Sequence, residues 1–354
     1  MTKLSLENDV VKMKPETTED ILELMNGCIY AAVLGAAMEL GVFWLLADRP
    51  LSAPELAQDL NIPLNRCHYW LQTLCKLGLL EVRGESYAPS AIAREAILDA
   101  LSQDAWAFQA REDRDLAVYG RDLASNIGKP MSAWGAGNLT PADYLQQIEA
   151  DPVYTARFTR KLYEIHTSLA EQLANLLDLR GVDRLLDLGG GSGVVSFALL
   201  RKRDELSSVV VDVESVCQAG RVIASENGLE ERVAYLAADF LEDDLPAGFD
   251  LVLLCDVGVF SETLFRKIHA VLNPNGRLAI VDKFAPGRTS APPSRLLTAF
   301  IKSLESPAQS VEYITAQVVQ TRLQRAGFRE ISTTAVPHED HLPWNIDWTL
   351  LVAR

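Results

Sequence analysis

The 354-residue sequence has few cysteines, no excess of positive charge and no leader-like start. Its cysteines, Cys28, Cys67, Cys75, Cys217 and Cys255, are odd in number and never form a C-x-x-C pair, which disfavours a disulfide framework or a zinc site. This pattern is typical of reduced thiols and predicts a cytoplasmic protein. The stretch MTKLSLENDVVKMKPETTED lacks an apolar core with a cleavage site, so no signal peptide is expected.

The charge balance is acidic, because 33 Lys and Arg stand against 48 Asp and Glu, for a net charge of −15. Such a charge disfavours non-specific binding to nucleic acid or to anionic membranes. The longest apolar run, CIYAAVLGAAMELGVFWLLA, is interrupted by Gly35, Glu39 and Gly41. A bilayer span needs about 20 predominantly apolar residues without a central charge. We therefore predict buried helices here and no membrane partner.

The N-terminal part of the chain predicts a helical domain that ends in a winged helix. Residues 18–46 follow a helical pattern, and Ser52 with Glu55 three positions later has the spacing of a capping box. A second helix, LNRCHYWLQTLCKLG, ends at Gly78, and LLEVRGESYAPS follows as a hairpin. Helix, turn, helix and wing together describe a winged helix.

Winged helices often bind DNA, so this function has to be weighed. A helix that reads DNA normally carries a concentrated basic face. The second helix offers only Arg66, His68 and Lys76 as possible contacts. We therefore expect no nucleic-acid partner, although a ligand-responsive transcription regulator stays open as an alternative.

Beyond residue 180 the chain alternates short apolar runs with helical patterns, after a long amphipathic helix over residues 151–179. Alternation of this kind predicts an α/β fold, a doubly wound parallel sheet with helices on both faces. The expected organisation is a helical and winged domain over 1–105, helical linker and substrate-pocket helices over 106–180, and the α/β domain over 181–354. The expected strands are DRLLDLG, SSVVVDVE, ERVAYLAADF, FDLVLLCDV, GRLAIVDKF and IDWTLLVAR.

The first of these strands runs into a glycine turn, DLGGGSG. The dinucleotide fingerprint G-x-G-x-x-G fails here because Val194 stands at its third position, and there is no G-K-[ST] of a P-loop. The glycines that do recur are Gly189, Gly191 and Gly193, directly after Asp187. Free amides at the start of the next helix suit a carboxylate ligand, and Asp212 ends the following strand.

The pattern D-x-G-x-G-x-G resembles that of S-adenosylmethionine (SAM) methyltransferases. The resemblance implies that Asp212 accepts the ribose hydroxyls and that the aspartate and phenylalanine of AADF meet the adenine. The cofactor-binding residues implied are Asp187, Gly189, Gly191, Gly193, Asp212, Asp239, Phe240 and Cys255.

The order of domains over nearly the whole chain resembles the small-molecule O-methyltransferases, the family of caffeate, hydroxyneurosporene and acetylserotonin enzymes. This resemblance implies a Rossmann-like SAM-methyltransferase domain behind a winged-helix dimerisation domain, and therefore a homodimer. It also implies a small aromatic or polyketide-like acceptor that is methylated on oxygen.

The usual catalytic histidine of that family is absent, because Val259 stands at its position. His166 on the long helix and Asp256 after the fourth strand are the residues we expect to act in catalysis. His269, His338 and His341 are expected to be structural or exposed. Lys283 stands where a metal site would have another acidic or amide ligand, so no metal is expected. Methylation of carbon, or a SAM-binding enzyme that does not transfer methyl, stays open as an alternative.

Overall fold

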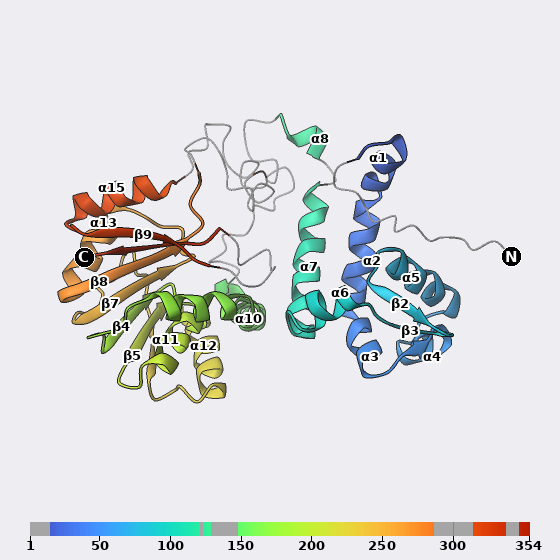
Figure 1. Ribbon diagram of the computed structural model, residues 1–354, viewed down its shortest axis with the longest axis horizontal. Helices are drawn as coiled ribbons and strands as arrows, with labels where there is room; N and C mark the ends of the chain where they lie inside the picture. The colour runs from blue at the N-terminus through green and yellow to red at the C-terminus, as the bar shows by residue number, and fades with distance from the viewer. Residues whose placement is uncertain (1–14, 121–122, 129–147, 287–299, 301–313, 338–346) are drawn as a thin grey trace. The chain divides into compact units, whose positions relative to one another are not determined.

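The computed structural model describes residues 15–120, 123–128, 148–286, 300, 314–337 and 347–354 (Figure 1). The chain divides into two compact units, Met1–Asp122 and Leu123–Arg354. The three-part division expected from the sequence remains a proposal.

The first unit is mainly helical and carries a small antiparallel sheet of order β1-β3-β2. Its strands are β1 (Leu51–Ser52), β2 (Leu80–Arg83) and β3 (Ser86–Pro89). Its helices are α1 (Thr18–Met25), α2 (Gly27–Glu39), α3 (Val42–Asp48), α4 (Ala53–Asp59), α5 (Leu64–Lys76), α6 (Ala91–Ala93), the π-helical turn Arg94–Leu98 and α7 (Gln103–Gly120).

The apolar N-terminal run forms separate helices because glycine and asparagine punctuate it. α1 and α2 meet at a bend of 46°, and Gly41 begins α3 in the left-handed conformation, with φ of 69°. Glu39 at the end of α2 forms ion pairs with Arg111 and Arg114 of α7. In the described part of the chain, no single helix is long and apolar enough to cross a membrane, although α1 and α2 together meet that criterion.

The predicted helix–turn–helix and hairpin are present. α4 begins with the capping box expected from Ser52 and Glu55. β2 and β3 pair antiparallel with Val82 opposite Tyr87, and β1 adds a third strand beside β3. Apolar side chains of α2, α3, α4 and α5 form the core of this unit, with Phe43, Leu46, Leu56 and Leu71 fully buried.

The second unit contains a seven-stranded sheet with helices on both faces (Figure 1). Its helices are α8 (Leu123–Asn126), α10 (Pro152–Leu176), α11 (Val194–Lys202), α12 (Glu214–Glu226), α13 (Glu262–Val271) and α15 (Ala316–Ala326). Its strands are β4 (Arg184–Leu188), β5 (Ser207–Asp212), β6 (Val233–Ala237), β7 (Phe249–Cys255), β8 (Leu272–Asp282), β9 (Ile331–Ala335) and β10 (Thr349–Ala353).

The strand order is β6-β5-β4-β7-β8-β10-β9, and the five strands from β6 to β8 are parallel. The predicted doubly wound α/β fold is confirmed. The expectation of parallel strands is wrong for β10, which pairs antiparallel with both β8 and β9. β9 is a strand that the sequence did not predict, because most of its side chains are exposed and lack an apolar alternation.

Side chains alternate between two cores along the central strands, as the period of a strand requires. On β7, Leu251 and Leu253 pack with α10, α11 and α12, whereas Val252 and Leu254 pack with α13 and α15. β4 lies between β5 and β7, so the chain crosses over in opposite directions on either side of it. This reversal leaves a crevice at the carboxyl end of β4, where doubly wound folds bind their ligands.

Candidate active site at the carboxyl edge of the sheet

A cavity of about 140 Å³ lies at the carboxyl ends of β4, β5 and β7, with α10 along one side. Five of the residues expected to bind the cofactor line it: Asp187, Gly189, Gly191, Asp212 and Cys255. The two residues expected to act in catalysis, His166 and Asp256, line it as well. The sheet therefore brings together residues that are far apart in the sequence.

The glycine turn is shaped both by its backbone and by close packing. Gly189, Gly191 and Gly193 all have positive φ, and Gly193 precedes α11 as its N-cap. Gly190 has no room for a side chain, because a Cβ there would lie 2.5 Å from the carboxylate carbon of Asp187. The turn thus keeps the backbone open toward the cavity and directly above Asp187.

Asp187 is only 1% exposed. Ser196 Oγ donates to its Oδ2 at 2.6 Å, and Ser196 and Ser208 share a further hydrogen bond of 2.8 Å. The other carboxylate oxygen, Oδ1, has no hydrogen-bond partner among the described residues. Burial, opposed by the Ser196 hydrogen bond, raises the pKa of Asp187 to about 6. A buried carboxylate oxygen beneath an open glycine turn fits a positively charged or hydrogen-bond-donating ligand.

Asp212 ends β5 and is hydrogen-bonded to the same turn. Its Oδ2 accepts from the backbone N–H of Gly191 at 2.9 Å, and its Oδ1 accepts from that of Val213 at 2.8 Å. Burial raises the pKa of this carboxyl above its ordinary value, while the two backbone donors oppose the rise. Each carboxylate oxygen has more than one lone pair, so Asp212 can hold the turn and still accept from a ligand hydroxyl.

Three of the expected cofactor residues, Gly193, Asp239 and Phe240, do not line the cavity. Phe240 is near it, since a ring carbon would lie 3.5 Å from a Cβ on Gly189. Asp239 is exposed, and its Oδ1 accepts from the backbone N–H of Leu241 at 2.9 Å. Gly193 packs against Phe197 and Tyr235 below the turn.

His166 and Asp256 face each other across one end of the cavity, with 3.8 Å between His166 Nε2 and Asp256 Oδ2. The other ring nitrogen, Nδ1, lies 3.0 Å from the carbonyl oxygen of Leu162. A carbonyl can only accept, so Nδ1 carries the hydrogen and Nε2 of the neutral ring presents its lone pair on the side of Asp256.

The backbone and the electrostatics of this pair are unusual. Asp256 has a φ of 55°, in the left-handed region that few residues other than glycine adopt. Burial lowers the pKa of His166 below its ordinary value, and the charge of Lys283 acts in the same direction. Asp256 and the Leu162 carbonyl act in the opposite direction. The net effect keeps the imidazole neutral near pH 7.

The sequence reasoning missed the face of α10 that lines the cavity. Phe158 and Leu162 precede His166 by eight and four positions, the spacing of one helix face, and Thr159 lies beside them. That spacing could have been noticed. Tyr235 was also missed; its hydroxyl donates to the Ser192 carbonyl at 2.7 Å and supports the turn from β6.

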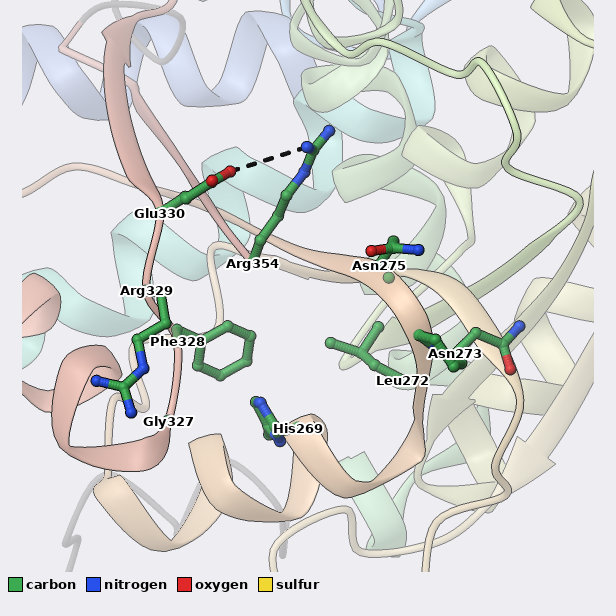
Figure 2. A pocket seen from close by; sticks show the side chains of 11 residues that line it. His269, Leu272, Asn273, Asn275, Gly327, Phe328, Arg329, Glu330 and Arg354 are labelled. Atoms are coloured by element: carbon green, nitrogen blue, oxygen red, sulfur yellow. Dashed lines mark ion pairs between the residues drawn. The ribbon is translucent and has the colours of Figure 1, made fainter.

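A larger cavity of about 560 Å³ lies at the opposite edge of the sheet, where β8 begins and β10 ends (Figure 2). His269 lies in it with its ring edge-on to Phe328, and Arg354 pairs with Glu330 at 3.9 Å. Ligands of doubly wound sheets bind at the carboxyl edge, so we assign the active site to the smaller cavity. His338 and His341 lie outside the described residues.

Comparisons with known proteins identify the family of the chain. The family model of the O-methyltransferase domain matches residues 130–329, and that of the O-methyltransferase dimerisation domain matches residues 22–98. The chain is 32% identical over 254 residues to 3-hydroxy-5-methyl-1-naphthoate 3-O-methyltransferase of Streptomyces sahachiroi. This alignment covers 71% of each chain. The chain is 26% identical over 331 residues to demethylspheroidene O-methyltransferase of Cereibacter sphaeroides, which covers 88% of this chain and 82% of that one.

Solved structures have the same fold. Human N-acetylserotonin methyltransferase in complex with SAM aligns over 97% of this chain and 99% of its own, with a TM-score of 0.74 and 20% identity. Family match and fold together define a SAM-dependent methyltransferase. The chain belongs to the O-methyltransferase family, and it carries that family's dimerisation domain.

Proposed function

We propose that the protein methylates a hydroxyl group of a small aromatic or polyketide-like acceptor and that His166 is the general base. The observation that carries this proposal is the 3.0 Å distance between His166 Nδ1 and the Leu162 carbonyl oxygen. The Nδ1–H of His166 donates to Leu162, which leaves Nε2 as a proton acceptor at the wall of the cofactor cavity. The base therefore comes from α10 and not from the end of β7, where Val259 replaces the usual histidine.

The cofactor residues have distinct parts in this proposal. Bound SAM supplies a methyl group on a positively charged sulfur, which is open to attack by an acceptor oxygen. Asp187 Oδ1, beneath the glycine turn, would hold the amino-acid end, and Asp212 would accept the ribose hydroxyls. Cys255 lines the wall of the cavity, Phe240 lies close to Gly189, and Gly193 packs at the base of the turn. In this proposal Asp239 and Phe240 are assigned to the adenine.

The proton of the acceptor hydroxyl passes to His166 Nε2 as the oxygen attacks. The imidazolium that forms then faces the Asp256 carboxylate, 3.8 Å from Nε2 before the transfer. Help of this kind from a general base accelerates a reaction by roughly 10²–10⁴. Phe158 and Leu162 on the same helix face place apolar side chains beside His166 at the cavity wall.

We also propose that the protein acts as a homodimer. The matched dimerisation domain supports this, as do the large apolar side chains that α1 and α2 expose, Ile21, Leu22, Met25 and Ile29. Light scattering behind size exclusion tests the dimer, and a monomer at micromolar concentration argues against it. The absence of nucleic-acid and membrane partners and the cytoplasmic location remain predictions.

A methyl-transfer assay tests the proposed function. The full-length protein is incubated with SAM and a panel of hydroxylated naphthoates, phenols and polyketide fragments, and products are analysed by mass spectrometry and NMR. A product with the added methyl on oxygen supports the proposal. A methyl on carbon, or consumption of SAM without a methylated product, replaces it with one of the alternatives.

A further inference from the structure

Trp348 and Lys283, which the proposed chemistry does not use, lie near His166 and form a chain of contacts with it. Trp348 meets the imidazole edge-on, with ring centroids 6.0 Å apart and an interplanar angle of 69°. Lys283 Nζ lies 4.7 Å from the centroid of the Trp348 ring. The indole, only 3% exposed, thus contacts an imidazole and an ammonium at once.

The strand register explains why Lys283 and Trp348 meet. β8 and β10 pair antiparallel with Asp282 opposite Thr349. The next pair along this ladder is Lys283 opposite Trp348, just past the ends of the two strands. Opposite residues of an antiparallel pair are within side-chain contact distance. The sheet therefore fixes this pair, and the backbone N–H of Asp256 is tied to the same edge by its 2.9 Å hydrogen bond to the Val281 carbonyl.

We propose that Lys283 and Trp348 are positioning residues for His166, with the indole fixing the plane of the imidazole and the ammonium keeping the ring unprotonated for the acceptor. This inference rests on the proposed role of His166 as the base. In this proposal neither Lys283 nor Trp348 touches the reacting atoms. Both act through the His166 imidazole, which takes the proton.

The charges that face His166 act against one another. The Asp256 carboxylate on the cavity side favours the imidazolium, and so does the Leu162 carbonyl on α10. Burial disfavours it, and Lys283 from the end of β8 adds a positive charge beyond the indole. Buried surroundings screen charges weakly, so Lys283 influences the ring through Trp348. Removing the lysine charge is therefore expected to raise the proton affinity of His166 and to leave a smaller fraction of neutral rings that can accept a proton.

The test needs no acceptor. The full-length protein is labelled with ¹³C,¹⁵N-histidine, and the His166 signal is identified as the one missing from His166→Gln. In Lys283→Met, we expect the proton affinity of His166 to rise about three- to tenfold, seen as a midpoint of titration at higher pH. Lys283→Arg is expected to keep the wild-type midpoint. Lys202→Met, which removes a lysine bonded to Asn175 on α10, is the matched control and should change nothing.

An unchanged His166 midpoint in Lys283→Met would overturn the proposal. Trp348→Phe and Trp348→Leu supply a second reading that does not depend on the lysine. In Trp348→Phe, the ring ¹⁵N shifts of His166 are expected to show one tautomer, and in Trp348→Leu they are expected to show a mixture of both. A single tautomer in both variants contradicts the orienting role of the indole. The proposed function fails separately, if His166→Gln keeps its turnover.

Discussion

We predict that the ionised Asp187 carboxylate destabilises the ligand-free protein and strengthens binding of the cofactor. The pKa of the Asp187 carboxyl rises from 3.8 to about 6, chiefly through burial. Because burial makes ionisation of Asp187 costly in the folded protein, the folded state is most stable while this carboxyl is neutral. The free energy of unfolding therefore falls as the pH rises through about 6. Each pKa unit corresponds to about 1.4 kcal/mol, so ionised Asp187 lowers the free energy of unfolding by about 3 kcal/mol above pH 7.

Asp187→Asn removes this ionisation while keeping the size of the side chain and an acceptor for Ser196. At pH 7.5 we expect the unliganded variant to be more stable than the wild type by about 2 kcal/mol, after about 1 kcal/mol for the new amide N–H that lacks a partner. At pH 4 that advantage disappears. The affinity for SAM, by contrast, falls at least tenfold, because the carboxylate no longer meets a cationic ligand.

Urea unfolding of the unliganded protein at pH 4, 6 and 7.5, together with calorimetric titration of SAM, measures both effects. Asp250→Asn is the control with the opposite sign. Burial raises the pKa of Asp250, but its bonds from Asn273 and from the N–H groups of Asp183 and Arg184 together outweigh burial and lower the pKa. Its stabilising effect is therefore present above about pH 4, and the variant loses stability at pH 7.5. An Asp187→Asn variant no more stable than the wild type at pH 7.5 refutes the reasoning.

Two further predictions concern the backbone of the site. Asp256 has a φ of 55°, which glycine adopts more readily than alanine. Asp256→Gly should therefore be more stable than Asp256→Ala by about 1 kcal/mol in thermal unfolding, while both variants lose methyl transfer to the same extent. Equal stability of the two variants would show that the backbone at this position is unstrained. A Cβ on Gly190 would lie 2.5 Å from the Asp187 carboxylate carbon, so Gly190→Ala should lose about 1–3 kcal/mol of stability and measurable SAM binding. Gly27→Ala, with nothing within 4 Å of the added Cβ, is its control, and a Gly190→Ala protein that behaves like this control contradicts the packing described.

Local features could be predicted from the sequence because neighbouring residues determine them. The capping box at Ser52 and the turn at Gly189–Gly193 depend only on residues a few positions apart, and both are present. The antiparallel direction of β10 could not be predicted, since an apolar strand looks the same in either direction. β9 escaped notice because its exposed side chains leave no alternating pattern.

The residues of the candidate site also divide into those that the sequence predicts and those whose placement depends on tertiary packing. Asp187 and Asp212 lie at the carboxyl ends of consecutive parallel strands, so their meeting at one end of the sheet follows from the order of elements. The group formed by His166, Lys283 and Trp348 depends on how α10 packs and on the register between β8 and β10. Neither is encoded in any local spacing, so the sequence identified Lys283 as unsuited to a metal site and as a charge neutraliser or an exposed lysine, but not as a neighbour of His166 or Trp348.

The most direct measurement is the turnover of His166→Gln with an accepted hydroxyl substrate, alongside its affinity for SAM and the matched variant His269→Gln. We predict that His166→Gln loses roughly 10²–10⁴ in kcat with its SAM affinity unchanged, and that His269→Gln, at the opposite sheet edge, stays at the wild-type rate. Wild-type turnover in His166→Gln would contradict the assignment of the base to α10.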